Sequence, residues 1–205
     1  MKRDLSVVAG IGVLIGTLAQ PVLSNVFVVT PALRAGVFVG CVLFAPFALF
    51  VAHILGKYIP AFYQFAKFGA VGTLNTLIDL GVLNCIIFAT GITAGVAYSV
   101  IKGFSFLIAT TNSFAWNRYW TFNTNQSATS SEAVKFYGVA IAGWVVNLVV
   151  ASYVVNSIGI PDSFTEKQWA NVGALSGILA TFLWNFLWYK FWVFKAATIA
   201  DEKVK

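Results

Sequence analysis

The chain contains six stretches of apolar residues, each close to the length that a helix needs to cross a lipid bilayer. They occupy approximately residues 5–29, 35–55, 64–89, 94–117, 133–157 and 169–194. About 20 consecutive apolar residues in a helix span the roughly 30 Å of hydrocarbon. With 59% hydrophobic and only 10% charged residues, the sequence predicts an all-helical integral membrane protein with about six transmembrane helices. With six such helices, the chain is too short to contain a soluble catalytic domain as well.

The first two apolar stretches are less regular than the other four. Gln20 and Pro21 interrupt the first stretch, and Pro46 interrupts the second. The start of the chain, Met1-Lys2-Arg3 before an apolar segment, resembles a signal peptide, but no small-x-small cleavage site follows. We therefore predict that the first stretch is a membrane helix. Two polar segments, residues 123–131 and 161–168, cannot lie in hydrocarbon and are predicted to be solvated loops.

Basic residues stand at the ends of the apolar stretches and favour one side of the membrane. If the N-terminus is inside, only Arg34 and Lys167 lie outside, and Lys102 lies within the fourth stretch. The predicted cytoplasmic ends hold Lys2, Arg3, Lys57, Lys67, Arg118, Lys135, Lys190, Lys195, Lys203 and Lys205. This excess predicts cytoplasmic N- and C-termini for a multi-pass protein of the inner (cytoplasmic) membrane. Because the basic residues form no continuous stripe, the net charge of +6 does not indicate a nucleic-acid partner.

Residues that could hold a cofactor or perform catalysis are scarce. Cys41 and Cys85 both fall inside apolar stretches, where cysteine usually acts as a small hydrophobic residue. His53 is the only histidine, so neither a zinc site nor a Ser-His-Asp triad can be assembled. No GxxxxGK[ST] phosphate-binding loop occurs in the chain. We expect no metal, no cofactor and no catalytic residue, and hence a protein that is not an enzyme.

The last four stretches contain an internal duplication. Lys67-Phe68 opens the third stretch and Lys135-Phe136 opens the fifth, and Asp79 and Asn147 follow twelve residues after each lysine. SFAWNRYWTF, residues 113–122, resembles TFLWNFLWYKFWVF, residues 181–194. In this comparison Phe114 and Asn117 pair with Phe182 and Asn185, and Trp120 and Phe122 pair with Trp192 and Phe194. We predict a bundle of two parallel two-helix repeats, with chance likeness between tryptophan-rich helices as the alternative.

Two of these motifs resemble a known family. FAKFGAVGTLNTLIDLGVL, residues 65–83, together with SFAWNRYWTF, is similar to the GtrA-like family of small four-helix membrane proteins, over about residues 63–195. The resemblance divides the chain into a two-helix N-terminal extension (1–60), a four-helix membrane domain (61–197) and a cytoplasmic tail (198–205). The first two helices depart from the family pattern.

The resemblance implies a role in glycosylation of cell-surface polysaccharide or teichoic acid. Members of the family are thought to move a polyprenyl-phosphate-linked sugar to the outer leaflet, where a separate membrane glycosyltransferase uses it. Two other functions remain open: an adaptor that holds such a glycosyltransferase without transport, and a small ion or proton-coupled transporter. Because four core helices enclose only a narrow groove, we also expect a homo-oligomer.

Polar residues of the third and fourth stretches are spaced so that they share faces. At 100° per residue, Asn75 and Asp79 lie on one face of the third helix, and Lys102, Asn112 and Asn117 lie on one face of the fourth. The helical rise places Asp79 about 18 Å above Lys67 and Lys102 about 24 Å above Arg118, so a salt bridge is predicted. Lys102 would bind the lipid phosphate in competition with Asp79. The alternatives are a purely structural pair, and a lysine that extends to the outer headgroups.

The remaining candidate residues lie in the two tryptophan-rich segments and the fifth helix. Arg118 stands at the predicted cytoplasmic end of the fourth helix, where a guanidinium can bind a phosphate with two hydrogen bonds or anchor the helix to headgroups. Lys190 occupies the corresponding place in the second half, where the anchor role is favoured. Asn147 and Asn185 are expected to form hydrogen bonds between helices, with substrate contact as the alternative.

Overall fold

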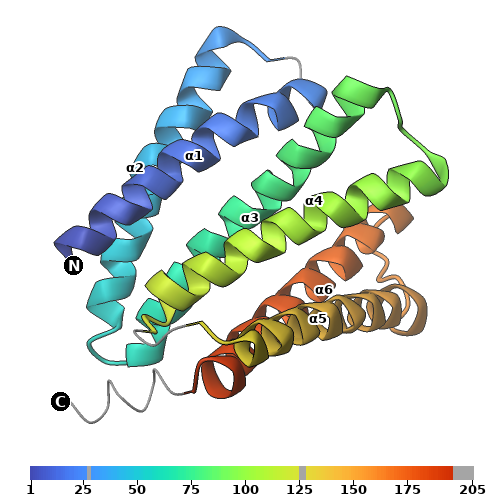
Figure 1. The fold of residues 1–205 in the computed structure, drawn as a ribbon. Helices are drawn as coiled ribbons and strands as arrows, with labels where there is room; N and C mark the ends of the chain where they lie inside the picture. The colour runs from blue at the N-terminus through green and yellow to red at the C-terminus, as the bar shows by residue number, and fades with distance from the viewer. Residues whose placement is uncertain (27–28, 125–127, 196–205) are drawn as a thin grey trace. The chain divides into compact units, whose positions relative to one another are not determined.

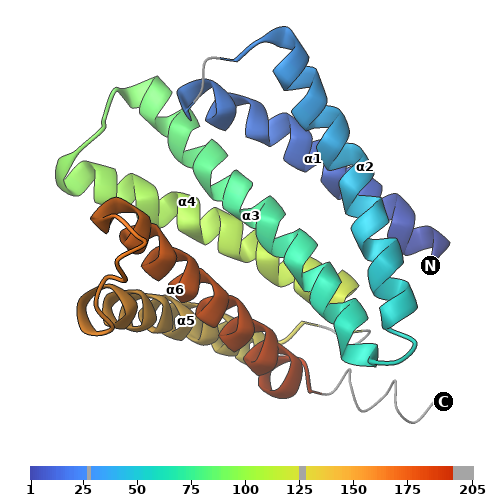
Figure 2. The same ribbon diagram turned by 180° about the vertical axis from the view of Figure 1, so that it is seen from behind.

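The computed structural model describes residues 1–26, 29–124 and 128–195, so the predicted cytoplasmic tail (198–205) lies outside the described residues. The chain divides into two compact units, Met1–Thr121 and Phe122–Lys205. Each unit is built from antiparallel helices that lie side by side (Figures 1 and 2). Neither contains a strand in the described residues.

The elements confirm the predicted all-helical membrane fold. The six helices are α1 (Lys2–Val26), α2 (Pro31–Leu55), α3 (Pro60–Thr90), α4 (Gly95–Trp116), α5 (Ser130–Ser157) and α6 (Glu166–Trp188). Two π-helical turns, η1 (Asn117–Thr121) and η2 (Tyr189–Val193), continue α4 and α6. Among the described residues, five segments are long and apolar enough to span a membrane, one in each helix except α4. α4 has 22 residues, which suffices for a crossing, and it carries Lys102 and several Ser, Thr and Asn residues.

Local sequence signals account for several helix ends. Thr30 caps α2 by accepting a hydrogen bond from the Leu33 amide at 3.2 Å, and Pro31 follows at the first helical position. α3 ends at Gly91, whose φ of 70° is the left-handed conformation that glycine adopts without strain. α5 begins three residues before the predicted start because Thr129 and Glu132 form a reciprocal capping box.

In the first unit, α1 and α2 pack on α3 as well as on each other. Val8, Ile11, Leu49 and Leu74 are core residues from these three helices. The helices α1 and α2 approach closely at Gly12, where a Cβ would lie 2.8 Å from the Cys41 carbonyl oxygen. The two N-terminal helices are thus packed against the helix that opens the predicted four-helix domain.

In the second unit, α5 and α6 are joined by aromatic stacking and interhelical hydrogen bonds. The rings of Phe136 and Tyr189 stack at 4.1 Å between centroids, with an interplanar angle of 11°. Thr181 Oγ1 donates to the Gly143 carbonyl at 2.8 Å, and Trp184 Nε1 donates to the Val139 carbonyl at 3.3 Å. The α5 carbonyls thus satisfy the hydroxyl of Thr181 and the indole N–H of Trp184, which would find no partner in hydrocarbon.

Candidate functional site

The salt bridge predicted between α3 and α4 is present. Lys102 Nζ donates to Asp79 Oδ2, and Ser105 Oγ lies 2.5 Å from Asp79 Oδ1. The side chain of Lys102 is 40% exposed and that of Asp79 is 21% exposed, whereas Ser105 is fully buried. The amine is therefore held by the carboxylate at a surface that other molecules can reach, between two helices within the membrane domain.

A second polar contact lies further along the same pair of helices. Asn112 Nδ2 donates to Asn75 Oδ1 at 2.7 Å, and Asn75 is buried. The Asn75 amide group, Nδ2, is buried without a hydrogen-bond partner. We call Asn75, Asp79, Lys102, Ser105 and Asn112 the α3–α4 seam. It combines one cation, one anion and an unused donor.

The two asparagines of the seam should contribute measurably to stability. We expect Asn112→Ala and Asn75→Ala each to lower the free energy of unfolding in mixed micelles by roughly 0.6–1 kcal/mol, the usual size of an interhelical hydrogen bond in a membrane. A double-mutant cycle should show that the two losses are not additive. Ser99→Ala is the matched control, because Ser99 donates to the Gly95 carbonyl of its own helix. Additive losses would mean that the contact contributes nothing.

An apolar groove of about 870 Å³ opens in the same unit, along the later part of α3. Its walls come from α1, α3 and α4, and include Leu18, Ile78, Val82, Ile86 and Phe104. Val82 and Ile86 lie three and seven residues after Asp79, and thus on the face of α3 that carries Asp79. Phe104 directly precedes Ser105, but Phe104 is exposed and Ser105 is buried, so their side chains lie on different faces of α4. The groove therefore continues along α3 beyond Asp79, and none of the five seam residues is among its lining residues.

Asn117 and Arg118 lie in the turn η1 and are fully buried. Asn117 Nδ2 donates back to Ser113, to its carbonyl oxygen at 2.9 Å and to Oγ at 3.1 Å, so the amide does not extend into the seam. The Arg118 guanidinium carbon lies 5.1 Å from the centroid of the Tyr119 ring. The sequence placed Arg118 at an open helix end, whereas its side chain has no exposed surface in the structure. A π-helical turn is a frequent feature of functional sites.

Asn147, Asn185 and Lys190 belong to the second unit. Asn185 lies next to Gly143, and its Oδ1 is buried without a hydrogen-bond partner. Asn147 faces Gly177, where α5 and α6 are in close contact. Lys190 Nζ lies 5.8 Å and 5.5 Å from the ring centroids of Phe186 and Phe191. The structure brings Asn147 and Asn185 to the α5–α6 interface and Lys190 to η2.

Contacts within the two units correspond, with one correction to the sequence comparison. Trp116 and Trp120 meet at 5.9 Å and 82°, and Trp188 and Trp192 meet at 5.8 Å and 81°, so residues 116 and 188 are equivalent. On this spacing Tyr189, not Asn185, corresponds to Asn117. The second half therefore contains its extra helical turn before Trp188, whereas the sequence comparison placed it after Asn185. Ala174 then takes the place of Lys102, so the second unit lacks the cation.

The sequence analysis missed a cluster around Asp4. Its carboxylate accepts hydrogen bonds from Lys67 Nζ at 3.0 Å, Trp120 Nε1 at 2.9 Å and Tyr63 Oη at 3.0 Å. Lys67 Nζ also lies over the rings of Tyr63 and Trp120, at 4.9 Å and 5.2 Å from the centroids. The sequence did contain a signal for this cluster. Asp4 is one of only seven acidic residues in the chain, and it directly follows Lys2 and Arg3.

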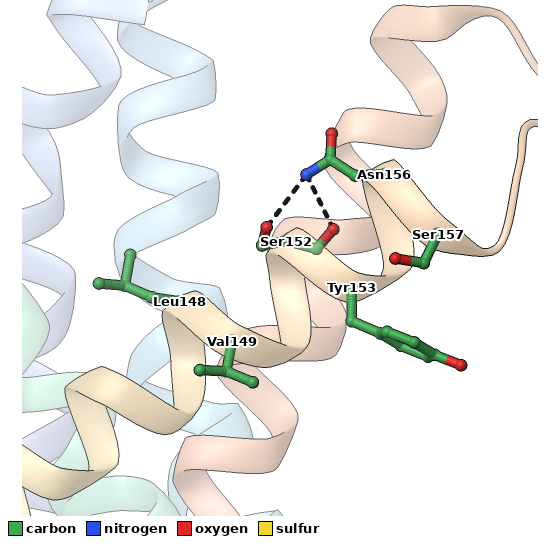
Figure 3. A pocket seen from close by; sticks show the side chains of 6 residues that line it. All are labelled: Leu148, Val149, Ser152, Tyr153, Asn156 and Ser157. Carbon is green, nitrogen blue, oxygen red and sulfur yellow. Dashed lines mark hydrogen bonds between the residues drawn. The ribbon is translucent and has the colours of Figure 1, made fainter.

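A shallow depression on α5 does not have the properties of a site. Figure 3 shows its lining residues, Leu148, Val149, Ser152, Tyr153, Asn156 and Ser157, all from one helix. Asn156 Nδ2 donates to the Ser152 carbonyl oxygen at 2.9 Å and to its Oγ at 3.0 Å (Figure 3). The Asn156 amide thus bonds within its own helix. In the part of the chain that the structure describes, no group of three His, Cys, Asp or Glu side chains could hold a metal ion.

Comparison with known proteins identifies relatives of the region that contains the seam. The family model for the GtrA/DPMS transmembrane domain matches residues 67–194. The chain is 30% identical over 128 residues to the "Uncharacterized membrane protein YngA" of Bacillus subtilis (strain 168). That match covers 62% of this chain and 77% of the relative. No solved structure matches the chain.

Proposed function

The chain belongs to the GtrA/DPMS transmembrane-domain family of multi-pass membrane proteins, and on this premise we propose that it is a lipid flippase. Its substrate is a polyprenyl-phosphate-linked sugar, which it moves from the cytoplasmic to the outer leaflet of the inner membrane. A membrane glycosyltransferase then transfers the sugar to a cell-envelope polysaccharide. The protein itself makes or breaks no covalent bond.

The single observation that carries this proposal is the ion pair of Asp79 and Lys102 between α3 and α4. An ionised lysine within a transmembrane helix is costly, and such residues usually mark substrate or ion pathways. The Lys102 side chain is 40% exposed, so the packing of α3 and α4 does not enclose the amine. Its accessibility supports a role in which the amine exchanges one anionic partner for another.

The geometry suggests how the parts of the substrate would be held. The lipid phosphate replaces Asp79 as the partner of Lys102, because charge-assisted hydrogen bonds to phosphate are strong. Asn75 Nδ2, buried without a partner, donates to a hydroxyl of the sugar. The prenyl chain lies in the apolar groove between Leu18 and Phe104. When the substrate leaves, Asp79 neutralises the lysine again.

The other candidate residues have supporting roles in this proposal. Arg118 and Asn117 stabilise η1 and bind the headgroup when that end of the domain opens. Lys190 anchors η2, and Asn147 and Asn185 join α5 to α6. The excess of basic residues at one end of the helices supports cytoplasmic termini. Transport is passive, driven by use of the sugar outside, or coupled to protons through Asp79. A homo-oligomer would widen the route.

The decisive experiment uses the full chain in liposomes that contain a polyprenyl-phosphate sugar. A membrane-impermeant reagent that modifies the sugar should reach lipid from both leaflets when the protein is present, and only the outer leaflet in protein-free vesicles. An adaptor would leave the inner-leaflet lipid protected and would copurify with a glycosyltransferase. An ion transporter would acidify vesicles that contain a pH-sensitive dye, without any lipid substrate. Either of these results would contradict the flippase proposal.

A further inference from the structure

Three donors from α3 and η1 converge on one carboxylate of α1. Tyr63 and Lys67 stand one helical turn apart on α3, and Trp120 lies in η1. Their donor atoms lie 2.9–3.0 Å from the oxygens of Asp4. The Lys67 side chain is 10% exposed and the Asp4 side chain is 20% exposed. These side chains therefore form a nearly closed anion site, and Asp4 occupies it.

If Asp4 moves away, the Lys67 ammonium is left without an anionic partner in this cluster. Without the carboxylate, Lys67 Nζ retains a hydrogen bond to the Trp120 carbonyl oxygen at 3.4 Å and cation–π contacts with the rings of Tyr63 and Trp120. These neutral groups do not compensate a buried charge. The phosphodiester of a polyprenyl-phosphate-linked sugar presents two non-bridging oxygens, as a carboxylate does, and their lone pairs can accept hydrogen bonds from an ammonium, an indole N–H and a phenol. The donor set therefore suits a phosphate in the same way as a carboxylate.

The donors and the anion come from different parts of the chain. Lys67 and Trp120 lie within residues 67–194, the region that matches the family, whereas Asp4 lies in the helix at the N-terminus. Lys67 stands twelve residues, about 18 Å, before Asp79 on α3. A lysine paired with an aspartate thus occurs at one end of α3 and again at the seam.

We propose that Tyr63, Lys67 and Trp120 form a binding site for the phosphate headgroup of a membrane lipid, and that Asp4 is its intramolecular competitor. This inference rests on the proposed function, because it makes the site the first of two phosphate positions along α3. The lipid enters when its phosphate displaces Asp4, and it reaches Lys102 afterwards. The helix α1 then acts as a gate that closes the site when no lipid is bound.

The experiment measures binding by the intact protein in detergent micelles. The probes are a polyprenyl monophosphate, the uncharged polyprenol and inorganic phosphate. Removing the competitor with Asp4→Asn should strengthen binding of polyprenyl monophosphate by at least about ten-fold. Adding Lys67→Gln to that variant should abolish the gain. Asp162→Asn, in an exposed loop, is the matched control and should bind as the natural protein does.

A second readout is thermal stability. Asp4→Asn should lower the melting temperature, and polyprenyl monophosphate should raise it again, because a ligand that binds the folded state stabilises it. Unchanged affinity in Asp4→Asn, or a gain that persists with Lys67→Gln, would overturn the inference. So would a variant that does not fold, because the carboxylate would then be a fixed structural partner. Equal binding of inorganic phosphate would exclude a lipid-specific site.

The outcome separates this inference from the proposed function. Tighter binding in Asp4→Asn with no translocation in liposomes would support the phosphate site and contradict the flippase proposal. Normal translocation by the natural protein, with unchanged lipid binding in Asp4→Asn, would contradict the gating role of α1 and support the flippase proposal.

Discussion

Replacing Lys102 with methionine should slow lipid translocation in proteoliposomes by at least about ten-fold. Methionine is long, flexible and apolar, so it fills much the same space but cannot bind a phosphate. A hydrogen bond to a charged group contributes about 1.5–3 kcal/mol, which corresponds to roughly 10- to 100-fold. The measurement is the initial rate at which inner-leaflet lipid becomes accessible to the impermeant reagent. Lys57→Met, in the exposed turn before α3, is the matched control and should transport normally.

An exchange of the two charges distinguishes transport from structural support. Asp79→Lys combined with Lys102→Asp restores an ion pair between α3 and α4 but places the amine on the other helix. If the pair only holds the helices together, this double variant should fold and transport like the natural protein. If Lys102 binds the phosphate beside Ser105, it should fold and transport slowly. Natural transport rates in Lys102→Met would contradict the proposed role of the amine.

The seam could be predicted because it depends on local geometry. The helical period determines which residues of α3 and α4 share a face, and the rise per residue determines their depth. Charged and amide side chains in an apolar stretch have few partners, so Asp79 and Lys102 were expected to meet, and they do. The positions of the helices could be predicted in the same way, because a helix that spans a membrane must have about 20 predominantly apolar residues.

The cluster around Asp4 could not be predicted from local patterns. Asp4 lies 63 positions before Lys67 and 116 positions before Trp120 in the chain, and the contacts exist only because α1 packs on α3. Small residues such as Gly12 permit the α1–α2 approach, but they do not specify which faces meet. The π-helical turn η1 is a further example, because its shifted hydrogen bonds leave no composition signal that separates Asn117–Thr121 from an ordinary helix end.

Gly177→Leu should destabilise the second unit, because α5 and α6 approach each other closely at this glycine. A Cβ at this position would lie 2.7 Å from the Asn147 backbone oxygen and 3.2 Å from Ala151 Cβ. The backbone oxygen cannot move without shifting α5, so the helices must separate. Overpacking of this kind costs typically about 1–3 kcal/mol, and here it would also lengthen the bond between Thr181 and Gly143. The free energy of unfolding in mixed micelles is the measurement.

Gly138→Leu is the matched control for this effect. Gly138 lies in the middle of α5's first half, and a Cβ there meets no atom within 4 Å. Leucine forms helix better than glycine by somewhat less than about 1 kcal/mol, so this variant should be as stable as the natural protein or slightly more so. Since the change from glycine to leucine alters helix propensity equally in both variants, the difference between their free energies of unfolding measures the effect of the close contact between Gly177 and Asn147. Equal stability of the two would mean that α5 and α6 do not depend on close approach at Gly177.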